Sequence, residues 1–303
     1  MRTRAAIIRE PGKPWEITEL ELDEPRQGEV RIKFAASGMC HSDEHLLADG
    51  TFRFHDDGGA DLGGFCMLGT FAERAVVSQN SCVPIEADIP FEVAALTGCG
   101  VPTGWGTAVY AAGVRAGQTV VIFGAGGVGS NAVQGARYAG AANVVVIDPV
   151  EFKRENALTF GATHVFADAA AAQEAVIDLT RGQLADHALI TIGVLNAEVV
   201  DQAAAIVGKG CQVTITSVGR SAEKQIQLAA NGSVVGWQRR IQGHVFGMCN
   251  PLSDIPRLLR LYQAGQLKLD ELITRRYSLD DINAGYQDLD DGKIIRGVIT
   301  HAQ

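Results

Sequence analysis

Most of the side chains that could do chemistry stand in one short run near the start of the chain. Residues Cys40 to His45 carry a thiol, a hydroxyl, two carboxyls and two imidazoles within six positions. A second thiol follows at Cys99, between two glycines. Thiolates and imidazoles bind zinc, and carboxyl and imidazole groups transfer protons in many active sites. The pattern therefore indicates one site for metal-assisted or proton-transfer chemistry.

A glycine-rich turn follows the apolar segment 119–123. Its glycines have the spacing G-x-G-x-x-G, which is typical of a dinucleotide-binding unit. The first glycine permits a tight turn, the second lets the backbone approach a pyrophosphate, and the third lets the next helix pack closely on its strand. The first N–H groups of that helix attract phosphate as well. The expected contacts to a dinucleotide are therefore Gly124, Gly126, Gly127, Val128 and Gly129.

An acid completes this pattern. The next apolar segment, 144–147, ends at Asp148, about 20 residues beyond the glycines. A carboxylate at this position suits the ribose hydroxyls of NAD and repels the extra phosphate of NADP. Two plainer interpretations stay open at this point. The glycines could form an ordinary structural turn, and Asp148 could only cap its strand.

The composition narrows the function classes. With 303 residues, 47% of them hydrophobic, the chain can bury a large core and divide into two domains. Its formal charge of -9 argues against nucleic acid and anionic membranes as partners. We expect a cytoplasmic protein with reduced thiols, because there is no bilayer-spanning apolar run, no signal-peptide pattern and no disulfide-like cysteine spacing. The cysteines expected to be small buried apolar side chains are Cys66, Cys82, Cys211 and Cys249.

Two kinds of pattern divide the chain. Short β segments are expected at 5–9, 15–20, 29–35 and 71–77. From about residue 101 strands alternate with helices, which predicts a doubly wound parallel sheet. A helix near 255–264 and a strand at 297–300 are expected to return to the first domain. The predicted class is α/β, with a β-rich domain over 1–100 and 248–303 and a nucleotide domain over 101–247.

Taken together, the motifs resemble those of the zinc-dependent medium-chain alcohol dehydrogenases, especially their bacterial nicotinoprotein and formaldehyde dehydrogenase-like branch. The resemblance extends over nearly every residue. It rests on the segments 40–45, 98–100, 124–129, 148–149, 152–153, 243–247, 269–274, 282–286 and 295–297. It implies a GroES-like catalytic domain, here incomplete, and a Rossmann domain that binds NAD.

The resemblance also implies roles for the residues of the first motif. Cys40 and Cys99 would be ligands of a catalytic zinc. Asp43 would contact the ligands and not the zinc itself. Ser42 would take the proton of the bound alcohol and pass it, through the ribose, to His45. A zinc ion with an open position lowers the pKa of an alcohol, and hydride then leaves for the nicotinamide.

Further roles concern the cofactor. By resemblance His41 and Arg296 would meet the pyrophosphate of NAD. Thr103 would lie against the nicotinamide, and Lys153 would belong to the cofactor site together with Asp148. Without the resemblance, Arg296 would be read as a surface charge.

The chain departs from the family in one block. The family takes its middle zinc ligand from a Gly-His-Glu segment between the positions of Cys40 and Cys99, and this chain has no such segment. It also lacks the four closely spaced cysteines that hold a structural zinc. The pattern breaks after Leu46, where roughly 70 residues are missing relative to the family. Either the protein has this deletion or the sequence omits a segment, and His45 or His55 could replace the absent ligand.

The leading hypothesis is NAD(H)-dependent oxidation of a primary alcohol to an aldehyde, or the reverse, by zinc-assisted hydride transfer. A catalytically defective NAD-binding protein and a zinc-free enone or quinone reductase of the same architecture are the alternatives. The expected partners are a small alcohol or aldehyde and further copies of the chain. A homodimer or homotetramer would form through the strand near 240–246.

Overall fold

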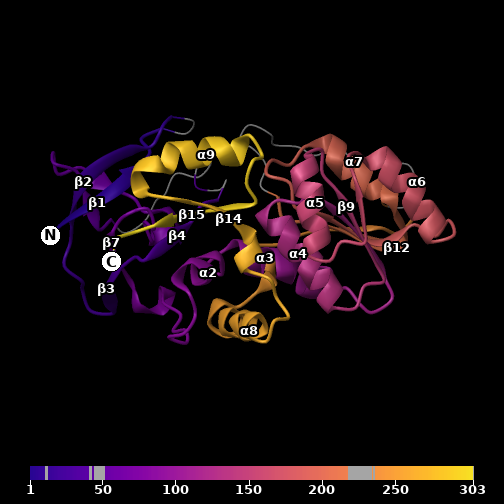
Figure 1. Cartoon of the computed structure of the whole chain (residues 1–303), viewed down its shortest axis with the longest axis horizontal. Coiled ribbons are helices and arrows are strands. Elements are labelled where there is room, and N and C mark those ends of the chain that lie inside the picture. Colours follow the sequence, from indigo (N-terminus) through magenta and orange to yellow (C-terminus); the bar gives the residue numbers. More distant parts are fainter. Residues whose placement is uncertain (11–12, 41–42, 44–51, 218–233, 235, 303) are drawn as a thin grey trace. The chain divides into compact units, whose positions relative to one another are not determined.

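The computed structural model describes residues 1–10, 13–40, 43, 52–217, 234 and 236–302 (Figure 1). The chain divides into two compact units. The first unit contains Met1–Leu96 and Leu269–Gln303, and the second unit contains Thr97–Lys268. Each unit is described separately below.

The second unit is built on one sheet. In spatial order, its strands within the described residues are β10 (His164–Phe166), β9 (Asn143–Ile147), β8 (Thr119–Phe123), β11 (Ala185–Ile190), β12 (Val207–Ile215) and β13 (Arg240–Gly243). All neighbouring strands in this order run parallel. The predicted α/β class with a parallel sheet is confirmed.

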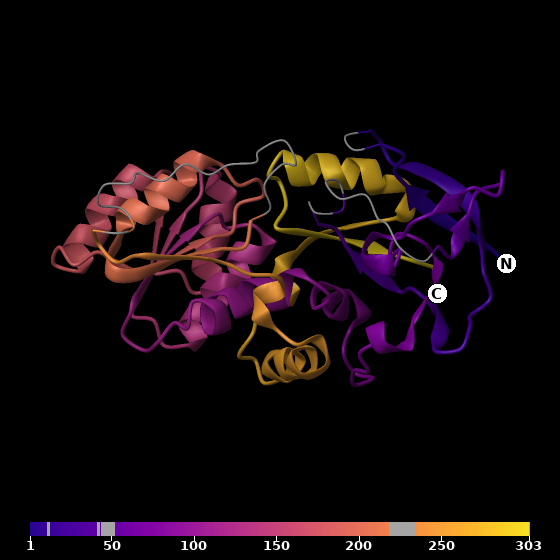
Figure 2. The same cartoon turned by 180° about the vertical axis from the view of Figure 1, so that it is seen from behind.

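Helices pack on this sheet because its central strands are apolar on both faces. Every residue of β8 is buried, and Val121 and Phe123 share a core cluster with Val176 and Val200 of the covering helices. These helices are α4 (Gly127–Tyr138), α5 (Glu151–Thr159), α6 (Ala169–Leu179) and α7 (Ala197–Ile206) (Figure 2). The side chains of Asp168 and Asn196 accept hydrogen bonds from the first turns of α6 and α7, which fixes where these helices begin.

The rest of the second unit is helical. It contains α3 (Gly100–Gly106), the π-helical turn η3 (Thr107–Ala111), the 3-10 turn η4 (Phe246–Met248) and α8 (Pro251–Gln263). The sequence predicts that α8 returns to the first domain, but the structure places it in the second unit. The physical reason is the buried carboxylate of Asp254 in α8, which accepts a 2.8 Å hydrogen bond from the hydroxyl of Tyr110. The division between the units therefore falls after Lys268, not at residue 247.

In the first unit, the described residues form short strands in three small sheets. One sheet has the order β1 (Arg2–Ile7), β2 (Glu16–Leu22), β5 (Phe54–His55) and β6 (Asp61–Leu62), and a second pairs β3 (Glu29–Lys33) with β7 (Arg74–Ser78). The third has the order β14 (Ile273–Tyr277), β15 (Arg296–Thr300) and β4 (Ala36–Gly38). In Figure 1 the yellow β15 lies beside the violet β4, so the predicted return of the strand at 297–300 is confirmed.

Short helices complete the first unit. They are η1 (Phe65–Met67), η2 (Gln79–Ser81), α2 (Phe91–Leu96), η5 (Asp270–Leu272), η6 (Leu279–Asp281) and α9 (Ile282–Asp290). The strand predicted over 29–35 is present as β3, which pairs with β7 as far as Lys33. The sequence analysis names no strand at 36–38, where β4 pairs with β15.

Candidate functional site

Two glycines of the turn after β8 are required by the protein's own backbone. Gly124 has a φ of +93°, a left-handed conformation that favours glycine. A Cβ built on Gly124 would lie 3.1 Å from the backbone nitrogen of Ile192. A Cβ on Gly129 would lie 1.9 Å from the carbonyl oxygen of Gly124. These observations agree with the tight turn and the close helix packing that the sequence predicts for the two positions.

Gly126 is different. Its φ of -70° is open to any residue, and a Cβ built there meets nothing within 4 Å. Neither the backbone conformation nor the packing of the described residues therefore calls for glycine at this position. The space beside Gly126 is open to a ligand, as expected if a pyrophosphate approaches the backbone there.

The helix that follows presents its N-terminus at the same point. Gly126 is the N-cap of α4, and no side chain of the described residues caps this helix end. The first N–H groups of an α-helix have no partner inside the helix and attract anions, helped by the helix dipole. Gly127 and Val128 lie in the first turn of α4, and their contact with phosphate stays a prediction.

Asp148 ends β9 and is buried. Its carboxylate accepts hydrogen bonds from the N–H of Ala125, at 2.8 Å, and from the N–H of Val150, at 2.9 Å. Asp148 therefore has the structural role that the plainer interpretation gives it, because its carboxylate holds two backbone N–H groups. A carboxylate has about four acceptor positions, so these two bonds do not use all of them, and the predicted contact with ribose hydroxyls stays a prediction. Lys153 lies in the first turn of α5 and is partly buried.

In the first unit, Asp43 connects the loop of the chemical motif to α9. Its Oδ2 accepts hydrogen bonds from the N–H of Cys40 and from the hydroxyl of Tyr286, both at 2.8 Å. Burial raises the pKa of Asp43 to about 7, and the thiol of Cys40 adds to the shift, while Tyr286, the N–H of Cys40 and the guanidinium of Arg296 oppose it. The Asp43 carboxyl therefore positions the backbone that carries Cys40.

Arg296 is 8% exposed, which removes its interpretation as a surface charge. One of its guanidinium nitrogens donates a 3.0 Å hydrogen bond to the carbonyl of Met39, the residue before Cys40. The guanidinium thus lies beside the motif, in the same unit. Its predicted contact with pyrophosphate stays a prediction.

The two predicted zinc ligands have the right chemistry but do not form a complete set. Cys40 is partly buried in the first unit, and Cys99 is exposed at the N-cap of α3 in the second. Among the described residues no three His, Cys, Asp or Glu side chains come together as a metal site. The described donor set therefore does not fit a complete catalytic zinc, which needs three protein ligands.

His55, one of the two suggested replacement ligands, is already engaged. Its Nδ1 lies 2.9 Å from a carboxylate oxygen of Asp61, and its Nε2 lies 3.2 Å from one of Asp23. Both ring nitrogens are therefore used within the β sheet. His41, Ser42, His45 and the predicted break after Leu46 lie outside the described residues.

Three further predictions concern single side chains. Thr103 is partly buried in α3, and its carbonyl accepts a 2.6 Å hydrogen bond from the hydroxyl of Thr107. Cys66 is exposed, so the expectation of a buried apolar thiol is wrong for it, because η1 turns it outward. Cys82, Cys211 and Cys249 are partly buried, and burial raises the pKa of the Cys249 thiol to about 12.

Tyr286 is the functional residue that the sequence analysis missed. The segment 282–286 was recognised as a motif, but no role was given to the tyrosine hydroxyl. Tyr286 is 3% exposed, and its hydroxyl donates a hydrogen bond to Asp43. The signal was the tyrosine on the apolar face of a C-terminal helix, because a buried hydroxyl needs a hydrogen-bond partner. A partner 243 positions away in the chain cannot be found from the spacing alone.

A glycine turn, an open helix N-terminus and an acid at the ends of adjacent parallel strands define a class of dinucleotide-binding proteins. A family model described as zinc-binding dehydrogenase matches residues 127–264. The chain is 46% identical to an NDMA-dependent alcohol dehydrogenase of Amycolatopsis methanolica, with 100% of both chains covered. It is 37% identical to alcohol dehydrogenase B of Mycobacterium tuberculosis, with 99% of both chains covered. The chain belongs to the zinc-binding medium-chain alcohol dehydrogenases, in their bacterial nicotinoprotein-like branch, and it is an oxidoreductase.

A solved structure supports the fold. The chain superposes on an alcohol dehydrogenase zinc-binding domain protein from Burkholderia ambifaria with a TM-score of 0.90 at 23% identity, covering 100% of both chains. The relatives do not favour the alternative of a defective NAD-binding protein or of an enone or quinone reductase. No helix in the described part of the chain is long and apolar enough to cross a membrane.

The length of the match bears on the missing block. The match with the Amycolatopsis enzyme extends over 371 aligned residues, whereas this chain has 303, so at least 68 aligned positions hold no residue of this chain. This agrees in size with the block of roughly 70 residues that the sequence predicts to be absent. Its place after Leu46 stays a prediction.

Proposed function

We propose that the protein oxidises a primary alcohol to an aldehyde, or catalyses the reverse, with NAD(H) as hydride carrier. The observation that carries the proposal is the full-length, 46% identity to an enzyme named as an alcohol dehydrogenase. The open space beside Gly126 supports it, because the described residues supply no other reason for a glycine there.

The cofactor site is proposed within the second unit. The N–H groups at the start of α4 would hold the pyrophosphate, with Gly126 allowing the close approach. The free acceptor positions of Asp148 would hold the ribose hydroxyls, and Thr103 would lie against the nicotinamide. Bound NAD supplies the hydride chemistry, while the chain supplies binding and orientation.

The alcohol site is proposed around the chemical motif of the first unit. Asp43 holds the backbone N–H of Cys40 and so positions the thiol. Ser42 and His45 are proposed to carry the proton of the alcohol away, and His41 and Arg296 to meet the pyrophosphate. Zinc is the proposed metal of the family, with Cys40 and Cys99 as ligands. Both ring nitrogens of His55 already contact carboxylates, which argues against His55 as a replacement ligand.

A pair of binding measurements tests the cofactor part. Gly126→Ala places a methyl group where the described residues leave open space, so the melting temperature should not change. NADH affinity, measured by the fluorescence of the bound dinucleotide, should fall by about tenfold or more, because the methyl group keeps a pyrophosphate away. Unchanged NADH affinity in this variant would contradict the proposed site.

A second measurement tests the metal part. The purified protein is analysed for zinc, and alcohol-dependent reduction of nicotinamide is followed before and after treatment with a chelator. We expect zinc in the protein and loss of the reaction on its removal. Full activity in a preparation freed of zinc would contradict zinc assistance while leaving NAD-dependent oxidation in place.

We also propose a cytoplasmic homodimer that forms along β13. This strand lies at the edge of the six-stranded sheet of the second unit, and Val245 just beyond it is 86% exposed. A strand edge that has no partner among the described residues, beside an exposed apolar side chain, favours pairing with a second copy. Val245→Glu should shift the protein to monomer in analytical ultracentrifugation. Glu198→Lys, a charge change on α7, serves as the control and should leave the assembly unchanged.

A further inference from the structure

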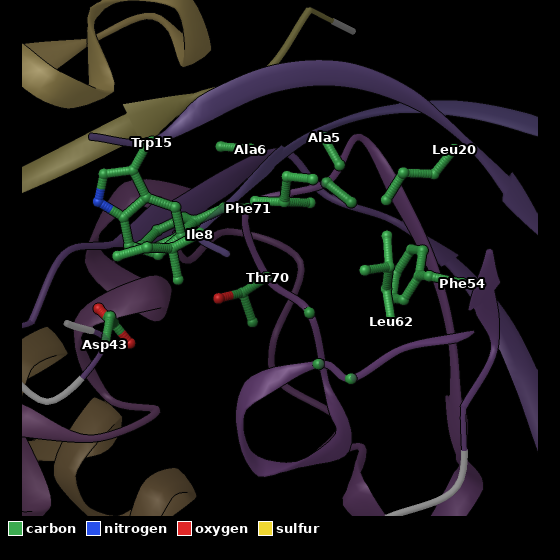
Figure 3. A pocket seen from close by; sticks show the side chains of 15 residues that line it. Ala5, Ala6, Ile8, Trp15, Leu20, Asp43, Phe54, Leu62, Thr70 and Phe71 are labelled. Carbon is green, nitrogen blue, oxygen red and sulfur yellow. The ribbon is translucent and has the colours of Figure 1, made fainter. Parts of the chain in front are cut away.

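The acids of the two proposed sites differ in how completely they are bonded. Asp43 lies at the margin of a cavity of about 280 Å³ in the first unit, which borders the proposed alcohol site (Figure 3). Both hydrogen bonds that the described residues donate to its carboxyl end on Oδ2. Asp148 in the second unit is held more firmly.

Asp148 has a hydrogen bond at each of its polar atoms. Its N–H donates to the carbonyl of Phe166 in β10 at 3.1 Å. Its Oδ2 accepts from the N–H of Ala125 at 2.8 Å, and its Oδ1 accepts from the N–H of Val150 at 2.9 Å. Its carbonyl accepts a 2.8 Å hydrogen bond from Nη1 of Arg154. Neither the backbone nor the carboxylate of Asp148 can therefore turn without the loss of a hydrogen bond.

Arg154 joins two consecutive carbonyls of the turn between β9 and α5. The same Nη1 donates to the carbonyl of Pro149, also at 2.8 Å. A proline has no backbone N–H, so this turn has one donor fewer with which to fix itself. The guanidinium therefore holds both peptide groups between Asp148 and Val150, the N-cap residue of α5.

The helix dipole gives no reason for a cation at this position. Arg154 is the fourth residue of α5 and follows Lys153, so two positive charges lie near the positive end of the helix dipole. Among the described residues, the side chain of Arg154 bonds to carbonyls and not to a carboxylate. What these bonds determine is the placement of Asp148.

We propose that Arg154 is a positioning residue for the cofactor, because it fixes the carboxylate of Asp148 in the orientation that meets the ribose hydroxyls of NAD. The inference rests on the dinucleotide site proposed above and adds to it a residue outside the glycine turn. A carboxylate that is already fixed binds hydroxyls without the entropy cost of ordering it. Without Arg154 the turn can move, so the ribose contact weakens while the phosphate contacts at α4 remain.

The test compares the binding of ADP and 2′,3′-dideoxy-ADP by isothermal titration calorimetry. The two probes share the adenine and the phosphates, but only ADP has the ribose hydroxyls. The wild type should bind ADP about tenfold more tightly, because hydrogen bonds to a charged group are lost with the dideoxy probe. Equal affinity for the two probes in the wild type would contradict the ribose contact of Asp148, and with it this inference.

The decisive variant is Arg154→Ala. It should lower the preference for ADP to about threefold or less, while the affinity for the dideoxy probe stays the same and shows that the variant is folded. Full preference in Arg154→Ala would overturn the positioning role and leave the dinucleotide site in place. An equal loss of affinity for both probes leaves the preference unchanged and would overturn the role as well.

Arg137→Ala is the matched control. It removes a similar 2.8 Å bond, from Nη1 of Arg137 to the carbonyl of Ala141 beyond the other end of α4. The preference for ADP should keep its wild-type value in this variant. A loss of preference as large as in Arg154→Ala would contradict a specific role of Arg154.

A double variant shows whether Arg154 acts through Asp148. Asp148→Asn should itself lower the preference for ADP, and the addition of Arg154→Ala should not lower it further, because the two changes affect the same contact. A further fall in the double variant would mean that Arg154 contacts the ribose directly, which would contradict the positioning role.

Discussion

The two acids singled out in the sequence sit in different kinds of environment in the two units. In the second unit the carboxylate of Asp148 accepts two backbone N–H groups, from Ala125 and Val150, both from the same strand–turn–helix stretch of chain. In the first unit the carboxyl of Asp43 is shared between the loop of Cys40 and the hydroxyl of Tyr286, which comes from α9 near the other end of the chain.

The difference has a physical consequence. A site made from one continuous stretch forms wherever that stretch folds, and the stretch from β8 to Asp148 is complete in this chain. A site made from distant segments depends on every segment that should pack around it. The proposed dinucleotide site of the second unit is therefore expected to form without distant segments, whereas the chemistry of the first unit depends on residues beyond those that the structure describes.

The largest expected effect separates a structural glycine from a ligand-facing one. Gly129→Ala forces a methyl carbon to within 1.9 Å of the carbonyl oxygen of Gly124, so α4 must move away from β8. We expect the free energy of unfolding to fall by about 3 kcal/mol or more in urea denaturation. Gly126→Ala is the matched control and should fall within about 0.5 kcal/mol of the wild type. Equal losses in the two variants would remove the distinction between the two positions.

An intermediate effect tests whether α8 belongs to the second unit. The buried carboxylate of Asp254 accepts hydrogen bonds from Tyr110, Arg257 and the N–H of Asn250. Asp254→Ala leaves the partly buried hydroxyl of Tyr110 and the N–H of Asn250 at the start of α8 without their acceptor, and it should cost about 2 kcal/mol of unfolding free energy. Arg257→Ala removes only a half-exposed partner and should cost less than about 1 kcal/mol. A neutral Asp254→Ala would show that this contact does not hold α8 in place.

The smallest effect is a dependence of stability on pH that involves both units. Burial lowers the pKa of His187 in the second unit and of His301 in the first below the ordinary 6.5. The unfolded chain therefore takes up protons first as the pH falls, so the free energy of unfolding decreases below about pH 6.5. Each histidine contributes a slope of at most about 1.4 kcal/mol per pH unit.

Single variants show how much each unit contributes to this dependence of stability on pH. His187→Gln and His301→Gln should each flatten the decrease in unfolding free energy between neutral and mildly acidic pH. In His301→Gln the amide can keep a bond to the hydroxyl of Ser37, which lies 3.1 Å from the ring nitrogen of His301. A decrease that is as steep in both variants as in the wild type would mean that other groups titrate.

The sequence predicted what depends on local pattern. The apolar strands β8 and β9, and the alternation of strands with helices beyond about residue 101, follow from hydrophobic periodicity. It did not predict the short strand β4, or that α8 packs in the second unit. Both depend on partners far away in the chain, Arg296–Thr300 for β4 and Tyr110 for α8. The same limit explains why Tyr286 was missed beside Asp43.

The most direct test of the central claim is the absorption spectrum of the nicotinamide when a primary alcohol is added to the purified protein with NAD. The account predicts that the oxidised nicotinamide becomes reduced, whether it stays bound or is released, and that Gly126→Ala loses this reaction at NAD concentrations that saturate the wild type. A protein that binds NADH but leaves the nicotinamide oxidised with every primary alcohol would contradict the account.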